Sequence, residues 1–317
     1  MALDPEVKRL LDIAAKLNPP AWESVGAVAA REMFLKSRGA SGGRRPDGVV
    51  SSDRTIPGPA GPIPVRLYRP ASEPADKALP ALIYVHGGGW VIGDLESHDV
   101  TAARLAVFAG VAVMSVDYRL APEHPFPAAF DDVVAALRWL AANAATVGID
   151  GARLAIGGDS AGANIAASAA ILARDEGIAA LRFQLLSYPV TDAVTTTESY
   201  QLFATGYGLT CASMQWFIDC YLPNEADRSD WRAAPLHAAS LQGVCPAFVM
   251  TCGYDPLRDE GRAYVRRLNG AGVRVDHVEF GGMNHGFLGS YALLHTARRA
   301  IATAALALRE ALIERAG

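Results

Sequence analysis

The chain has 317 residues, 51% hydrophobic and 20% charged, a composition typical of globular domains and sufficient for one large or two modest ones. Its 29 Lys and Arg against 33 Asp and Glu leave a net charge of −4 without long runs of one sign, which argues against a nucleic-acid-binding protein. No apolar run reaches the roughly 18 residues of a membrane span, and acidic Asp4 and Glu6 stand where a secretory signal is basic.

The cysteines indicate a reducing compartment. Cys211, Cys220, Cys245 and Cys252 show no C-x-x-C spacing, so we interpret them as reduced thiols. Together with the absence of a recognisable signal, this predicts a cytoplasmic protein.

The first part of the chain is predicted to be helical. Apolar residues recur at helical spacing over 4–18 and 21–37, and Pro19-Pro20 separates the two patterns. A segment rich in Gly, Ser and Arg follows at 39–47. We expect residues 1–45 to form N-terminal cap helices and a linker to the main body.

Strands and helices then alternate along the chain. Apolar and polar residues alternate at 65–68, which predicts a half-buried strand. Short apolar runs typical of strands buried on both faces lie at 81–85, 111–116, 154–156, 183–186 and 247–252, and a last strand is predicted at 273–280. Helical patterns lie at 98–109, 128–146, 161–175, 257–269 and 291–315. The alternation predicts an α/β fold, with a mostly parallel central sheet flanked by helices, built from a first part at 46–190 and a second part at 241–317.

One segment interrupts this alternation. Residues 191–240 contain no strand-like run but carry aromatic side chains in a weakly helical setting, among them Trp216, Phe217, Tyr221 and Trp231. An insertion of this length between two strands is usually functional. We expect it to form a cap together with the N-terminal helices.

A tight turn is predicted at Gly158-Asp159-Ser160-Ala161-Gly162, between the strand at 154–156 and the helix at 161–175. Its glycines let strand and helix approach closely, and the turn forces the serine into a strained conformation. The hydroxyl then projects at a helix N-terminus, whose dipole favours negative charge. This is the nucleophile elbow of the α/β-hydrolase fold, and it predicts Ser160 as nucleophile. No lysine follows the glycines, which argues against a nucleotide-binding loop.

A second glycine motif, His86-Gly87-Gly88-Gly89-Trp90, directly follows the predicted strand at 81–85. Glycines let backbone N–H groups surround a small anion, and each such donor to the oxyanion of acyl transfer is worth about 3–4 kcal/mol. We expect N–H groups of this loop to form the oxyanion hole, which the N–H of Ala161, next after the nucleophile, should complete.

The general base should be a histidine beyond Ser160, because the order in this fold is serine, acid, histidine. His277 falls within the last predicted strand, His295 within the closing helix and His237 within the insertion. Only His285 lies in a glycine-bounded loop after the last strand, which can carry an imidazole to the serine. We therefore predict His285 as the base.

The acid should stand at the carboxyl end of a strand. Asp255 directly follows the run 249–254 and meets this requirement. It would bind one imidazole nitrogen, set the tautomer and stabilise the cation formed in catalysis. The alternatives are Asp192, which follows another strand, and Asp259, which we expect at the N-terminus of the next helix.

These motifs together resemble the hormone-sensitive lipase family of esterases, bacterial family IV. Further motifs of that family are Tyr118-Arg119-Leu120-Ala121-Pro122-Glu123, Asp255-Pro256-Leu257-Arg258-Asp259 and His285-Gly286-Phe287, in the family's order. The resemblance implies a helical cap over an α/β-hydrolase core. It implies Ser160, Asp255 and His285 as the triad, and the N–H groups of Gly88, Gly89 and Ala161 as the oxyanion donors, a role that Gly87 could share. It also implies a carboxylesterase for short- to medium-chain esters, which works through a serine acyl-enzyme intermediate without metal or cofactor.

The substrate pocket is less sharply defined. Trp90, Tyr188, Phe203, Leu209 and Phe287 are candidates to line it, although core or cap packing explains each of them equally well.

Alternative functions remain open at this point. The same residues would serve a hydrolase of amides or lactones, and a ligand-binding receptor can share the scaffold, although an intact Ser160, Asp255 and His285 argue against a receptor. We expect a small-molecule ester as partner. The strand at 273–280 comes last and is expected at a sheet edge, which would allow a homodimer.

Overall fold

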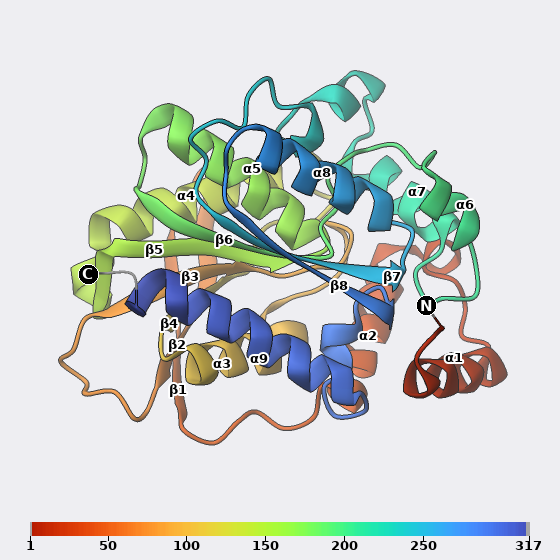
Figure 1. Ribbon diagram of the computed structural model, residues 1–317, viewed down its shortest axis with the longest axis horizontal. Helices are drawn as coiled ribbons and strands as arrows, with labels where there is room; N and C mark the ends of the chain where they lie inside the picture. Colours follow the sequence, from red (N-terminus) through yellow and green to blue (C-terminus); the bar gives the residue numbers. More distant parts are fainter. Residues whose placement is uncertain (1, 315–317) are drawn as a thin grey trace.

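A computed structural model, which describes residues 2–314, shows one central sheet between two layers of helices (Figure 1). The strands of this 8-stranded sheet follow the order β1-β2-β4-β3-β5-β6-β7-β8. Their bounds are β1 (Val49–Gly58), β2 (Gly61–Pro70), β3 (Leu79–Val85), β4 (Ala112–Val116), β5 (Ile149–Asp159), β6 (Leu181–Ser187), β7 (Ala247–Tyr254) and β8 (Val275–Asn284). Strands β3 to β8 run parallel to one another, and β2 pairs antiparallel with β1 and β4.

Helices cover both faces of the sheet. The α-helices are α1 (Pro5–Leu17), α2 (Trp22–Gly42), α3 (Leu95–Ala109), α4 (Ala128–Asn143), α5 (Ala161–Glu176), α6 (Glu198–Leu202), α7 (Cys211–Tyr221), α8 (Arg258–Gly270) and α9 (His295–Arg309). Helices α3 and α9 lie on one face, and α4, α5 and α8 on the other (Figure 1). The predicted α/β fold with a mostly parallel sheet is confirmed.

The central strands are buried on both faces, which explains their unbroken apolar sequence pattern. All residues of β3 are buried, because helices cover both of its faces. Along this strand Ile83 and Val85 belong to the apolar cluster shared with α4 and α5, while Leu82 and Tyr84 belong to the cluster shared with α3 and α9. The alternation follows from the two-residue period of a strand.

The antiparallel hairpin β1–β2 was only partly predicted. Only 65–68 was expected as a strand, whereas β2 spans ten residues and β1 was not expected at all. In β1 only Ile56 is buried, since this strand forms the sheet edge and is rich in polar residues. The other edge is formed by β8, as predicted for the last strand.

The N-terminal segment also differs in detail from the prediction. Helix α2 continues to Gly42, so the first part of the expected linker at 39–47 is helical. The Ser41 hydroxyl oxygen in the last turn of α2 lies 2.9 Å from the carbonyl oxygens of both Ser37 and Gly289, to one of which at a time it can donate its single proton. At the other end, α9 starts at His295 rather than 291 and ends at Arg309, followed by a π-helical turn, Glu310–Glu314. Residue 315 of the predicted helix lies outside the described residues.

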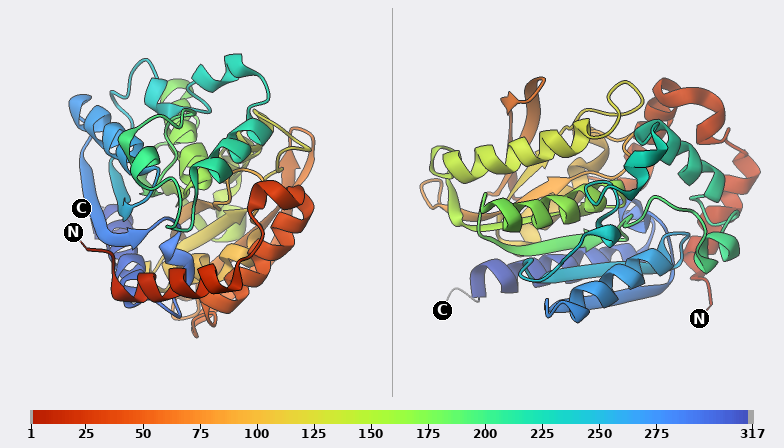
Figure 2. Two further views of the ribbon diagram at one scale, coloured as in Figure 1. Left: turned by 90° about the vertical axis from the view of Figure 1, so that its right-hand side faces the viewer. Right: turned by 90° about the horizontal axis from the view of Figure 1, so that it is seen from above.

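Two segments far apart in sequence meet beyond the carboxyl ends of the strands. Helices α1 and α2 lie at the same end of the molecule as α6 and α7 (Figure 2). Helix α2 contacts α7, and the Ser213 hydroxyl donates to Glu23 (3.0 Å). The insertion therefore packs against the N-terminal segment. None of the helices in residues 2–314 is long and apolar enough to cross a membrane.

A buried carboxyl group anchors the start of the insertion. Glu260 on α8 is 1% exposed, and its carboxyl oxygen accepts a hydrogen bond from the N–H of Thr191 (2.7 Å). Burial raises the pKa of Glu260 well above its usual range, and the nearby charges of Asp192 and Asp255 raise it further against the effect of the Thr191 N–H.

The closest approach of strand and helix occurs where β3, β5 and α5 meet. A Cβ atom added to Gly162 would lie 2.0 Å from the carbonyl oxygen of Val85, and one added to Gly158 would lie 2.1 Å from the same atom. Only glycine fits at these two positions, so α5 can begin directly against the sheet.

We expect Gly162→Ala to lower the free energy of unfolding by about 1–3 kcal/mol, the usual cost of overpacking. The Val85 carbonyl cannot retreat freely, because its strand pairs with neighbours on both sides. Denaturant unfolding measures the effect. Gly39→Ala in α2 is the control, since nothing lies within 4 Å of its added Cβ. An equal loss in both variants would contradict the steric explanation.

The buried carboxyl group of Glu260 should make the stability of the protein depend on pH. Because the pKa of Glu260 is raised in the folded state, its contribution to stability is complete below the unfolded value of about 4.3 and is lost as the pH rises toward the folded pKa. Glu260→Gln mimics the protonated carboxyl group. We therefore expect the melting temperature of this variant, relative to the unsubstituted protein, to rise between about pH 5 and about pH 8.

Glu279→Gln is the control for this experiment. Its hydrogen bonds from Arg262 lower the pKa of Glu279, so this carboxylate is charged throughout the same pH range. The loss of this charge should lower the melting temperature, relative to the unsubstituted protein, by an amount that does not change with pH. If the melting-temperature difference between Glu260→Gln and the unsubstituted protein is also independent of pH, the buried carboxyl group of Glu260 is not protonated.

Candidate active site

Ser160 occupies the predicted sharp turn between β5 and α5. Its backbone has φ 56° and ψ −122°, a positive φ that is strained for a residue with a side chain. The Ser160 N–H donates to the Ser187 carbonyl at the end of β6 (2.9 Å), which ties the turn to the neighbouring strand. The residue is 7% exposed, so its hydroxyl lies in a nearly enclosed space.

His285 lies between Ser160 and Asp255. Its Nε2 atom is 2.9 Å from the Ser160 Oγ, and its Nδ1 atom is 2.7 Å from an Asp255 carboxylate oxygen. The other carboxylate oxygen of Asp255 accepts the N–H of Leu257 (2.9 Å), and Asp255 is fully buried. With the proton on Nδ1 shared with Asp255, Nε2 is free to accept the serine proton. The three residues predicted from sequence are thus brought together at the ends of β5, β7 and β8.

The two alternative acids have other partners. Asp192 lies 2.9 Å from Nε2 of His237. Asp259 accepts hydrogen bonds from the N–H of Ser199 (2.9 Å) and from Arg258 (2.9 Å). Both carboxylates are therefore engaged in contacts within or next to the insertion.

The remaining candidate histidines also have partners elsewhere. His277 lies 2.9 Å from the Thr251 hydroxyl on the neighbouring strand, and His295 lies 2.6 Å from Glu6 of α1. In the described part of the chain, His285 is the histidine with a hydrogen bond to Ser160.

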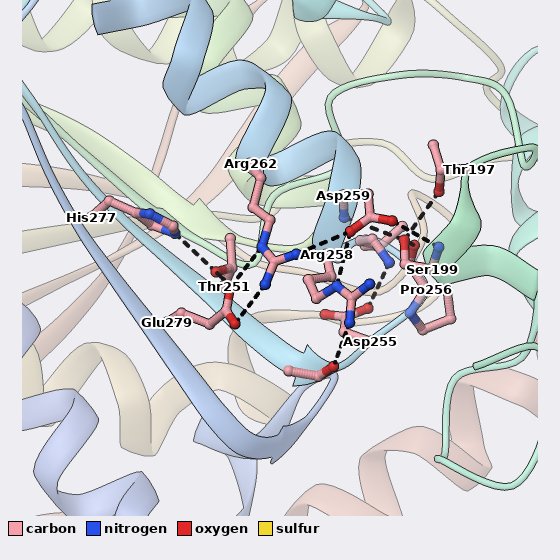
Figure 3. A network of polar contacts seen from close by, with 12 residues as sticks. Thr197, Ser199, Thr251, Asp255, Pro256, Arg258, Asp259, Arg262, His277 and Glu279 are labelled. Carbon is pink, nitrogen blue, oxygen red and sulfur yellow. Dashed lines mark hydrogen bonds and ion pairs between the residues drawn. The ribbon is translucent and has the colours of Figure 1, made fainter. Parts of the chain in front are cut away.

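A polar network holds the loop that carries Asp255 (Figure 3). The Ser199 hydroxyl donates to the Pro256 carbonyl (2.6 Å), so α6 is attached directly beside Asp255. Two parallel hydrogen bonds of 2.7 Å join Arg262 of α8 to Glu279 of β8. The network connects α6, α8 and β8 around the acid, so the position of Asp255 does not depend on His285 alone.

The predicted oxyanion loop has the backbone that its glycines allow. Gly88 and Gly89 have φ values of 126° and 57°, and a Cβ atom on Gly88 would lie 2.1 Å from the Ile92 carbonyl oxygen. A Cβ atom on Gly89 would lie 2.2 Å from the ring of Phe217. Ala161, the third predicted donor, is the first residue of α5, where N–H groups have no partner within the helix.

Asp159 connects this loop to the nucleophile turn. Its carboxylate accepts hydrogen bonds from the Gly87 N–H (3.1 Å) and the Tyr84 hydroxyl (2.7 Å), and His98 lies 3.4 Å away. Burial tends to raise the pKa of Asp159, but His98, Arg38 and Tyr84 together hold it below its usual range. A charged carboxylate directly before Ser160 therefore fixes the start of the oxyanion loop.

His86 supports the same loop from inside. Its Nδ1 atom lies 3.0 Å from the Gly87 carbonyl, and its ring stacks on Tyr118 at 4.2 Å between centroids. Burial, with the nearby His98, lowers the pKa of His86 to about 4. At neutral pH this ring is uncharged.

Two of the five candidate pocket residues lie near the triad. The Tyr188 ring meets the His285 ring edge-on at 4.8 Å between centroids, and Phe287 lies 6.0 Å from Tyr188. By contrast Trp90 is 1% exposed and stacks on Tyr221 at 4.5 Å.

The other two candidates lie in the insertion. Phe203 contacts the rings of Tyr207 and Tyr254, with centroids 5.3 and 5.5 Å away. Leu209 is half-buried and packs against the core cluster that includes Phe217. Neither has a ring contact or hydrogen bond with the triad.

Sequence reasoning missed Phe217, whose ring covers the oxyanion glycine Gly89. Phe217 was noted only as one of several aromatic residues of the insertion. Helical spacing on α7 puts it on the same face as Met214, Ile218 and Tyr221, which are all buried. Nothing in that pattern separates a residue over the site from ordinary packing. Within residues 2–314 no group of three or more His, Cys, Asp or Glu side chains is arranged to hold a metal ion.

Comparison with known proteins identifies the family. A family described as having the alpha/beta hydrolase fold matches residues 82–289. Ethyl acetate hydrolase of Pseudomonas putida is 38% identical over 98% of this chain and 100% of its own length. The carboxylic ester hydrolase LipN of Mycobacterium tuberculosis is 45% identical over 77% of this chain and 66% of its own length.

Solved structures agree with this assignment. A thermostable esterase from Pseudomonas putida superimposes with a TM-score of 0.94 at 36% identity, covering 98% of each chain. An α/β hydrolase from the metagenome of Lake Arreo in Spain has a TM-score of 0.93 at 43% identity, covering 97% of this chain and 98% of its own. The chain therefore belongs to the α/β-hydrolase family and is a carboxylic ester hydrolase, as its resemblance to the hormone-sensitive lipase family predicted.

Proposed function

We propose that Ser160, His285 and Asp255 form the catalytic triad of this esterase, and that the N–H groups of Gly88, Gly89 and Ala161 bind the oxyanion. The observation that carries the proposal is the position of His285, with one ring nitrogen 2.9 Å from Ser160 and the other 2.7 Å from Asp255. A base that contacts both nucleophile and acid is the arrangement required for nucleophilic acyl transfer.

The first half-reaction forms the acyl-enzyme. As the Ser160 oxygen attacks the ester carbonyl carbon, its proton passes to Nε2 of His285, and Asp255 stabilises the resulting imidazolium. The carbonyl oxygen becomes negatively charged and accepts hydrogen bonds from the glycine loop and the first turn of α5. The tetrahedral intermediate then collapses, and the alcohol leaves with the proton from His285.

The second half-reaction releases the acid. Water gives a proton to His285 and attacks the acyl carbon, and a second tetrahedral intermediate forms in the same oxyanion site. Its collapse breaks the bond to Ser160, whose oxygen regains the proton. The cycle needs no group beyond these side chains and backbone amides.

We propose further that residues 1–45 and 191–240 form a cap that limits substrates to short- and medium-chain esters. Contact between α2 and α7, the low exposure of Ser160 and the Phe217 ring against Gly89 support this proposal. The name of the relative that hydrolyses ethyl acetate is in line with a small acyl group.

Two wider expectations stay predictions. A cytoplasmic location rests on the sequence, and the four cysteines are free in the structure. A homodimer through β8 is supported by its place at the sheet edge, where one side of the strand is unpaired within the sheet.

Substitutions in the triad test the first proposal. Ser160→Ala should abolish hydrolysis of p-nitrophenyl butyrate, with an unchanged circular dichroism spectrum. Asp255→Asn should lower kcat by about 10⁴-fold, because the imidazole loses its orienting acceptor. Asp192→Asn is the matched control and should lower kcat far less. Activity retained by Ser160→Ala, or a greater loss in Asp192→Asn than in Asp255→Asn, would refute these roles.

An acyl-length series tests the cap. For p-nitrophenyl esters, kcat/KM should fall beyond medium chains, and Phe217→Ala should raise the long-to-short ratio about tenfold, because a removed side chain admits further methylene groups. Phe108→Ala, on α3 and 40% exposed, is the control and should leave the ratio unchanged. If Phe217→Ala leaves the ratio of kcat/KM for long and short esters unchanged, the Phe217 ring does not limit the acyl site.

A further inference from the structure

The N-terminal segment is attached to the loop that carries His285, which we call the histidine loop (residues 282–292). Before the histidine, the Asp4 N–H donates to the Gly282 carbonyl (3.0 Å). After it, the Ser41 hydroxyl donates to the Gly289 carbonyl (2.9 Å), and the Ala292 N–H donates to the Ser41 carbonyl (3.1 Å). The loop is therefore held from both sides by residues near the start of the chain.

Arg38 of α2 lies between these attachments. Its Nη1 donates to the carbonyl of Gly286, the residue directly after His285 (3.3 Å), and its guanidinium lies 4.8 Å from the centre of the Phe34 ring. Arg38 is half-buried, and in the described part of the chain this carbonyl and this ring are the groups that contact its guanidinium, whose charge also helps to lower the pKa of Asp159. A carbonyl and an aromatic face, rather than a carboxylate, thus hold this cation in place.

At Gly289 of the histidine loop, the Arg38 guanidinium occupies the space that a side chain would fill. A Cβ atom on Gly289 would lie 1.0 Å from Nη1 of Arg38, so the guanidinium rests directly on the Gly289 backbone. A Cβ atom on Gly286 would lie 3.7 Å from Nη2. The φ of Gly289 is one that other residues can adopt, so a side chain at this position would conflict with the Arg38 guanidinium and not with the backbone conformation.

We propose that Arg38 is a positioning residue for the reaction: it holds the histidine loop so that the His285 ring stays within reach of both Ser160 and Asp255. This inference rests on the proposed role of His285 as the base. Beyond the end of β8, Gly286 and Gly289 give the loop a backbone with few steric restraints. Since an error of 1 Å in a reacting group can cost about 10²-fold in rate, the restraint must come from outside the loop.

The N-terminal helices would thus position the histidine loop in addition to covering the site. Helix α2 packs beside the 3₁₀ turn Phe287–Ser290 that follows the histidine (Figure 1). Residues close to the start of the chain therefore act on a base near its end, through a cation that touches neither the serine nor the substrate carbonyl.

The test uses turnover per active site. Active sites are counted by the burst of p-nitrophenol or by labelling with a phosphonate, so that a variant that merely folds less well loses sites rather than turnover. We expect Arg38→Ala to lower kcat per site about tenfold, less than the 10²-fold limit for a 1 Å error, with KM changed less than twofold. Guanidinium ions at millimolar concentration should restore part of kcat.

Gly289→Ala provides an independent variant. Its methyl group would displace the Arg38 guanidinium without removing it, so we expect the same loss of kcat per site as in Arg38→Ala. The double variant should lose no more than either single variant, because both remove one interaction. Arg44→Ala, at a side chain 90% exposed near the end of the same helix, should keep full turnover.

The outcomes separate this inference from the proposed triad. If the unsubstituted protein is not labelled at Ser160, the triad itself fails. If it is labelled and Arg38→Ala turns over normally per site, or if the losses of Arg38→Ala and Gly289→Ala multiply in the double variant, the positioning role is refuted.

Discussion

The contact of the Val85 carbonyl with Gly158 and Gly162 is the constraint on which the site depends. Because no side chain separates β3 from the start of α5, the turn that carries Ser160 lies directly beside the loop that follows β3. The nucleophile and the glycine loop are therefore neighbours through backbone contact. Asp159 adds one charged group to this contact, since its carboxylate binds the Gly87 N–H at the start of the loop.

Around this rigid centre the acid and the base are attached in different ways. Asp255 is fully buried, and the polar network of α6, α8 and β8 surrounds its loop (Figure 3). His285 lies in a glycine-rich loop after an edge strand, where the sheet restrains it on one side only. The contacts from Asp4, Arg38 and Ser41 supply the restraint that the sheet cannot give.

Much of the fold could be predicted because its central strands are buried on both faces and read as unbroken apolar runs. The edge hairpin could not, because β1 is mostly exposed and its polar residues resemble a linker. Ser160, Asp255 and His285 could be proposed from sequence because each follows a predicted strand. Phe217 and Arg38 could not, because they come from helices whose pattern reports packing, and only the folded chain shows which backbone they meet.

Different elements contact the serine turn and the oxyanion glycine Gly89, which affects how the substrate selectivity of such a protein can change in evolution. In the serine turn, Gly158 and Gly162 lie against the sheet, where even a single added methyl group has no room. Gly89 lies instead against an aromatic ring from an inserted helix that takes no part in the sheet. Substitutions in the insertion can therefore change the substrate selectivity while the serine turn and the sheet stay the same.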